Sequence, residues 1–71
     1  MKPGTIVQLE DGRMGTVVYH NLDGYGIIFG KQKVNPNELP EPEAMLRNGY
    51  PSAQYPCVGN NYKIIEKGKF V

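Results

Sequence analysis

The sequence has few of the residues on which disulfides, zinc sites and nucleophilic active sites depend. It contains a single cysteine, Cys57, and a single histidine, His20. One cysteine cannot form an intramolecular disulfide, and two ligands fall short of the four that a structural zinc site takes. A cysteine–histidine pair would also need a group that orients the histidine, and no spacing in the chain indicates one. We therefore expect neither a catalytic site nor a metal.

Further absences disfavour nucleotide cofactors and membranes. The chain has neither a G-x-G-x-x-G segment ahead of a helix nor a P-loop lysine, so we expect no cofactor. No run approaches the ~18 consecutive apolar residues that a membrane helix needs. The opening segment, residues 1–4, also lacks the apolar stretch of a signal peptide. These features predict a soluble, cytoplasmic protein without a membrane partner.

Charge of either sign is not in excess. Eight lysines and arginines face seven acidic residues, which leaves a formal net charge of +1. Domains built to hold phosphates usually carry a strong basic excess. Nucleic-acid binding would therefore need a local cationic patch.

Glycine and proline, by contrast, are abundant. Nine glycines and six prolines in 71 residues indicate many tight turns between short strands. A chain of this length forms one domain, here residues 1–71, and buries only about 60% of the surface that its unfolded state exposes. The composition therefore favours a small β domain with an economical core.

Alternating apolar and polar residues predict three strands in the first half of the chain. The pair Asp11-Gly12 predicts a tight turn between the first two strands, and residues 21–24 predict another before the third. The expected strands are Gly4–Glu10, Met14–His20 and Tyr25–Gly30. Their expected inward-facing residues are Val7, Leu9, Val17, Tyr19, Ile27 and Phe29.

The second half gives weaker signals. A short fourth strand is expected over Gln32–Val34, and proline and glycine punctuation predicts a short helix within Glu41–Gly49. Two tyrosine–proline steps predict an ordered loop over Tyr50–Gly59, since a residue before proline favours extended geometry. A last strand is expected over Tyr62–Glu66. The predicted fold is mainly β, a five-stranded antiparallel barrel with one short helix and a long Tyr/Pro loop.

The segment PGTIVQLEDGRMGTVVYHNLDGYGIIF resembles the opening of small SH3-like barrels of the KOW and PsaE kind. The matching positions are Gly4, Val7, Leu9, Gly15, Thr16, Val17, Ile27 and Phe29. The resemblance covers roughly the first forty residues and implies a fold rather than a function, because this barrel serves RNA-binding, protein-binding and structural roles. Residues 41–59 have no counterpart in the minimal motif, so we look there for a function particular to this protein.

Tyrosine is the most informative residue type for function. Five tyrosines outnumber two phenylalanines, and a tyrosine can offer an apolar face while its hydroxyl stays in water. Aromatic platforms of this kind accept extended or proline-rich segments. We therefore predict a non-enzymatic protein-interaction module, which could be an accessory subunit, with a binding surface made of Tyr25, Tyr50, Tyr55 and Pro56. The alternative is that Tyr50 and Tyr55 only pack the loop against the barrel.

Two other functions stay open. A weak RNA- or DNA-binding accessory domain would use a cationic surface of Arg13, Lys31, Lys33 and Lys63. Against it, lysines on a terminal strand also serve to prevent pairing with other chains. A homo-oligomer, in which a second copy covers an edge strand or a loop, is the third possibility.

Overall fold

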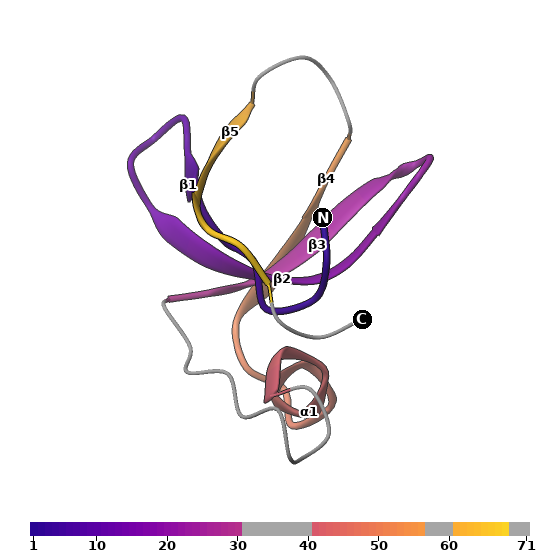
Figure 1. The fold of residues 1–71 in the computed structure, drawn as a ribbon. Helices are drawn as coiled ribbons and strands as arrows, with labels where there is room; N and C mark the ends of the chain where they lie inside the picture. The colour runs from indigo at the N-terminus through magenta and orange to yellow at the C-terminus, as the bar shows by residue number, and fades with distance from the viewer. Residues whose placement is uncertain (31–40, 57–60, 69–71) are drawn as a thin grey trace.

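A computed structural model describes residues 1–30, 41–56 and 61–68 of the chain. It contains five strands and one short helix, in the order drawn in Figure 1. No helix in the described part of the chain is long and apolar enough to cross a membrane. The elements are β1 (Ile6–Leu9), β2 (Met14–Asn21), β3 (Gly24–Phe29), α1 (Glu41–Arg47), β4 (Ser52–Tyr55) and β5 (Tyr62–Glu66).

The five strands form one antiparallel sheet with the order β4-β3-β2-β1-β5. The predicted mainly β class with five antiparallel strands and one helix is therefore confirmed, and this arrangement is compatible with an SH3-like fold. The sheet is not closed into a barrel, because β4 and β5 end the strand order and do not pair with each other. Figure 1 shows the strands curling around a common interior with α1 below them.

The fourth strand differs from the prediction. The segment Ser52–Tyr55, expected to be part of a loop, forms β4 and pairs with β3. The prediction of a loop over these residues was wrong because β4 depends on its long-range partner and carries no apolar alternation of its own. The strand expected over Gln32–Val34 lies outside the described residues.

Local chemistry explains both hairpins. In the β1–β2 turn, Gly12 has a φ of 90° and its N–H donates to the Leu9 carbonyl over 2.9 Å. In the β2–β3 turn, the side-chain oxygen of Asn21 accepts hydrogen bonds from the N–H groups of Asp23 (2.9 Å) and Gly24 (3.2 Å). This Asx-type bracing fixes the tip of the second hairpin.

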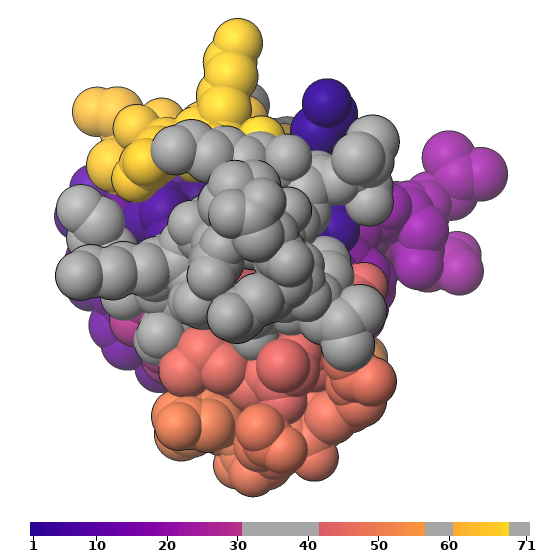
Figure 2. Space-filling view, turned by 60° about the horizontal axis from the view of Figure 1, so that its bottom comes forward, coloured from indigo at the N-terminus to yellow at the C-terminus, as the bar shows by residue number. Residues whose placement is uncertain are grey.

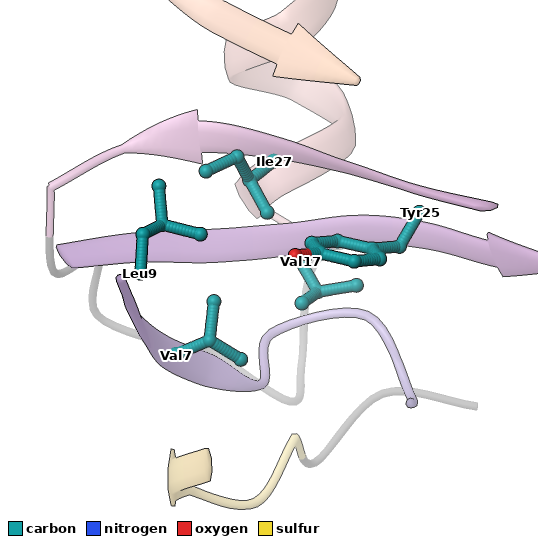
Figure 3. Packing of buried hydrophobic residues seen from close by; sticks show 5 residues of the cluster. All are labelled: Val7, Leu9, Val17, Tyr25 and Ile27. Atoms are coloured by element: carbon teal, nitrogen blue, oxygen red, sulfur yellow. The ribbon is translucent and has the colours of Figure 1, made fainter. Parts of the chain in front are cut away.

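A compact apolar cluster fills the interior of the curled sheet. Val7, Val17, Tyr25 and Ile27 are fully buried, and Leu9 is nearly so. Figure 3 shows these five side chains meeting between β1, β2 and β3. Alternate residues on the opposite face are buried as well, namely Ile6, Thr16, Val18 and Ile28. The central strands are therefore covered on both sides.

Helix α1 packs against β2 and β3. Its second residue, Pro42, is buried, a position at which the missing N–H of proline costs no intrahelical bond. After the helix, Gly49 adopts a φ of 81° and donates its N–H to the Leu46 carbonyl over 3.2 Å. A glycine with positive φ is a frequent helix terminator. The predicted short helix within Glu41–Gly49 is confirmed.

One irregularity decides which side chains reach the surface. The β2–β3 register shifts between Val17, which lies opposite Ile27, and Tyr19, which lies opposite Gly26. A bulge of this kind adds one residue to a strand and moves the following side chains to the other face. The prediction that Val17 and Tyr19 share the inner face was therefore wrong, and Tyr19 lies on the outer face beside Gly26.

Candidate protein-binding surface

Tyr25 is a core residue rather than part of an exposed platform. Its side chain is 0% exposed, so the prediction that it offers a surface for a partner is wrong. Its ring stacks on Tyr55 with 5.6 Å between centroids and meets Tyr62 edge-on at 5.1 Å. Tyr55 belongs to β4 and Tyr62 to β5, the two strands at the ends of the sheet order. Aromatic packing through Tyr25 therefore links the edges that backbone hydrogen bonds do not join.

The other three predicted partner-binding residues separate into two places. Tyr50 follows α1, where its N–H donates to the Met45 carbonyl over 3.1 Å, and its side chain is half exposed. Tyr55 ends β4, at the far end of the strand from Tyr50, and Pro56 comes directly after it. The structure therefore brings Tyr55 and Pro56 together but not Tyr50. The partly buried Tyr55 packs against the core and is also among the residues that line a surface groove.

A shallow groove of about 530 Å³ lies where the β2–β3 hairpin meets the end of β4. We call it the hairpin groove. Figures 1 and 2 show the tip of this hairpin projecting from the rest of the molecule. The groove is lined by Tyr19, Asn21, Asp23, Gly24, Gln54, Tyr55 and Pro56.

Two glycines of β3 allow close approaches beside the hairpin groove. Gly26 pairs with Tyr19 on one side and with Gln54 on the other, so these three residues form a row across three strands. A Cβ atom at Gly26 would come within 2.3 Å of the Tyr19 ring, and one at Gly24 within 2.2 Å of the Tyr55 carbonyl oxygen. Only glycine therefore permits both close approaches. The Tyr19 ring thus lies over Gly26, and the backbone at the end of β4 lies against Gly24.

The lining of the groove is aromatic and polar, with one charged side chain. Tyr19 contributes a ring, Asn21 and Gln54 contribute amides, and Asp23 contributes the carboxylate. Pro56 and Tyr55, whose ring stacks on the core residue Tyr25, complete the lining. Next to Asp23, the side chain of Leu22 is fully exposed at the hairpin tip. Such a surface can stack on apolar side chains, hydrogen-bond to a peptide backbone and attract one cation.

Arg13, predicted for nucleic-acid binding, already has an acidic partner. Its Nε donates to the Asp11 carboxylate over 2.6 Å, and its guanidinium lies 4.5 Å from the centre of the Phe29 ring. The Arg13 backbone N–H also donates to Asp11 over 3.0 Å. This backbone bond, together with the bond and charge of the guanidinium, lowers the pKa of Asp11 below its ordinary value of 3.8. The cation of Arg13 is therefore offset locally.

Of the other three predicted cations, the structure describes only Lys63. Lys63 is exposed on β5, opposite Gln8, and lines a shallow hollow that it shares with Glu10. Lys31 and Lys33 lie outside the described residues. Over the described part of the chain, the predicted nucleic-acid surface therefore reduces to Arg13 and Lys63. Arg13 is paired with Asp11, and Lys63 lines the same hollow as Glu10.

His20 is exposed at the end of β2, where its ring packs edge-on against Tyr25 and its Nδ1 contacts the N-terminal amine of Met1. Cys57 lies outside the described residues. Within the described segments, no three histidine, cysteine or acidic side chains come together in a group that could hold a metal ion.

Tyr19, Asn21 and Gln54 line the hairpin groove but were not among the residues predicted for binding. Tyr19 was assigned to the core because nothing in the sequence Val17-Val18 indicates the bulge that turns the Tyr19 side chain outward. Gln54 was hidden in a segment expected to be a loop. The available signal was the pair of glycines around Tyr25, which removes two side chains from the same sheet face.

Comparisons of the chain with models of protein families, with curated proteins and with solved structures find no match.

Proposed function

We propose that this protein is a non-enzymatic interaction module that binds an extended segment of another protein in the hairpin groove. The observation that carries the proposal is the row Tyr19, Gly26 and Gln54, in which the Tyr19 ring lies over Gly26 and the exposed Gln54 follows on β4. Tyr55 and Pro56, two residues predicted for partner binding, line the same groove. An aromatic surface with amides at its sides suits an extended peptide.

The groove favours a segment that carries one cation for Asp23 and little further charge. Asp23 is the one ionisable carboxylate among its lining residues, and the chain as a whole carries a net charge of only +1. Long-range attraction therefore contributes little, and contacts within the groove must supply the affinity. We expect modest affinity, typical of a small accessory subunit that joins a larger assembly through one peptide.

The finer assignment of the fold belongs to the same proposal. The strand order and the resemblance of residues 3–29 support an SH3-like domain of the KOW or PsaE kind. We propose that it acts in the cytoplasm. Self-association through an open strand edge is a competing proposal, and the experiments below distinguish it from binding of a partner.

Selection from a displayed library of random heptapeptides tests the proposal. We expect the wild-type domain to enrich a family of related peptides and Asp23→Lys to lose them, because the groove charge is reversed. Glu66→Lys is the matched control, since it makes the same charge reversal at an exposed position on β5, away from the groove. Both variants should keep the wild-type circular dichroism spectrum. Failure to enrich any peptide, or equal loss in the two variants, would refute groove binding.

A further inference from the structure

The pairing of β4 with β3 determines which backbone groups of β4 point outward. The Phe29 N–H donates to the Pro51 carbonyl over 3.0 Å, so this opposed pair is a hydrogen-bonded one. Hydrogen-bonded and non-hydrogen-bonded pairs alternate along an antiparallel ladder. The next pair, Ile28 with Ser52, is therefore non-hydrogen-bonded, and so is Gly26 with Gln54. Ser52 and Gln54 thus direct their N–H and C=O groups away from β3.

The other side of β3 supports this alternation. The Gly30 N–H donates to the Met14 carbonyl over 2.9 Å, and Gly30 and Met14 continue the β2–β3 register in which Thr16 lies opposite Ile28. Even-numbered residues at this end of β3 therefore bond to β2, which leaves odd-numbered ones for β4. Within the described residues, β4 pairs only with β3, and both Ser52 and Gln54 are exposed.

The two edges of the sheet are protected differently. On β5, Lys63 and Glu66 place charges along the edge, and an irregularity interrupts its pairing with β1. Charges and bulges are the usual means by which an edge strand avoids pairing with another chain. The sequence of β4, Ser-Ala-Gln-Tyr, has no charge, and its register with β3 is regular. As far as residues 1–30, 41–56 and 61–68 are concerned, the β4 edge is therefore the one that is open to a partner.

We infer that the edge of β4 accepts an extended strand of a partner protein, which hydrogen-bonds to Ser52 and Gln54 while its side chains enter the hairpin groove. This inference rests on the proposed function and specifies how the peptide is held. Pro51 and Pro56 flank β4, and Pro56 has no N–H to donate, so the added ladder is short. A partner segment of about four or five residues matches the length of the edge.

The chemistry of the groove defines the partner strand further. Gln54 sends its side chain into the groove and its backbone groups to the outer edge, so edge and groove adjoin at this residue. A lysine or arginine in the partner strand would reach Asp23, the charged side chain of the lining. A second copy of this chain is a poorer occupant. Two four-residue edges, each about 13 Å long, bury far less than the roughly 1,200 Å² of a stable dimer.

Proline substitution provides a matched test of the backbone contacts. Both Gln54→Ala and Gln54→Pro remove the amide side chain, but only Gln54→Pro removes the outward N–H. Proline is tolerated where the N–H of an edge strand faces solvent, so Gln54→Pro should stay folded. Ala53→Pro removes an N–H that bonds to β3 and should lower the unfolding midpoint. The difference in unfolding midpoint between Gln54→Pro and Ala53→Pro therefore tests, without any ligand, which backbone N–H groups of β4 point away from β3.

Binding is then measured by fluorescence polarisation with the most enriched heptapeptide from the selection above. We expect Gln54→Pro to bind at least fivefold more weakly than Gln54→Ala, which corresponds to one lost backbone hydrogen bond. Equal affinities of the two variants would overturn strand addition but leave groove binding intact. A selection that enriches no peptide would remove both proposals. Concentration-dependent dimerisation that Gln54→Pro abolishes would also overturn the inference, since a second copy would then occupy the edge.

Discussion

The close packing of Ile27 on Gly15 predicts a compensating pair of substitutions. A Cβ atom at Gly15 would lie 2.5 Å from Cδ1 of Ile27, whereas ordinary contacts begin near 3.4 Å. Ile27 is fully buried, so its side chain cannot swing into solvent. Overpacking of this kind costs about 1–3 kcal/mol. Gly15 has no positive φ, so replacing it with alanine also stabilises the fold by roughly 0.4–1 kcal/mol, because the unfolded chain loses conformational entropy. We therefore expect Gly15→Ala to destabilise the fold by about 1–2 kcal/mol.

Ile27→Val removes the atom that causes the clash. Alone, this substitution should cost about 0.5–1.5 kcal/mol. The Cβ and Cγ1 of Ile27, which remain in valine, would lie 3.3 and 3.4 Å from the new methyl group, a tight but tolerable contact. In the Ile27→Val background, Gly15→Ala should therefore be nearly neutral. The two substitutions should show a favourable coupling of about 1–2 kcal/mol.

Urea denaturation of the four proteins of this cycle measures the coupling, and thermal midpoints check it, since 1 kcal/mol moves the midpoint of a domain this small by about 4–8 °C. Ile28→Val is the control, because it removes the same methyl group from the adjacent buried residue, which is not among the atoms near Gly15. It should not rescue Gly15→Ala. Equal cost of Gly15→Ala in the wild-type and Ile27→Val backgrounds would refute the packing argument.

Three further predictions concern turns, charge and partners. Gly12→Ala should destabilise the domain by roughly 1–2 kcal/mol in urea denaturation, since the φ of 90° rather than a clash demands glycine there, and Gly12→Asn should cost less. The Asp11 carboxyl should titrate below 3.8 by NMR, and Arg13→Ala should raise its pKa only in part because the backbone N–H remains. Because the folded-state pKa is lowered, the stabilisation by Asp11 is present above its unfolded-state pKa and is lost as pH falls through the folded-state value. If the nucleic-acid alternative holds, binding to single-stranded DNA at low salt should weaken as salt rises and depend on Lys63; no binding at low salt would exclude it.

The first three strands could be predicted because their signals are local. Alternation in Gly4–Glu10 and the turn at Asp11-Gly12 define a hairpin whatever the rest of the chain does. The strand β4 is different, since its short polar sequence and the prolines on either side of it favour a loop until β3 supplies a partner. The resemblance to small SH3-like barrels is likewise strongest where the pattern is local.

The surface could be predicted only in part for the same reason. Tyr55 and Pro56 were identified by residue type, but whether a tyrosine lies in the core or in the groove depends on its flanking residues. Gly24 and Gly26 let other groups approach closely on both sides of Tyr25, which is fully buried. For Tyr19, one added residue in β2 reverses the face. Neither effect appears in composition or periodicity.

The burial of Tyr25 connects the stability of this domain with its proposed function. In a closed barrel, hydrogen bonds between the first and last strands in the sheet order would use up both edges. Here the ring of Tyr25 contacts Tyr55 on β4 and Tyr62 on β5, so side-chain packing holds the two ends of the curled sheet together. The outward backbone groups of β4 are not used in this packing. Each end of the sheet then needs its own protection. The charges and irregular pairing of β5 supply it there. Among the residues that the structure describes, β4 has only its flanking prolines, which limit the length of an added strand without preventing one. An edge left open for so short a distance, directly beside a groove, favours a short partner strand over uncontrolled association.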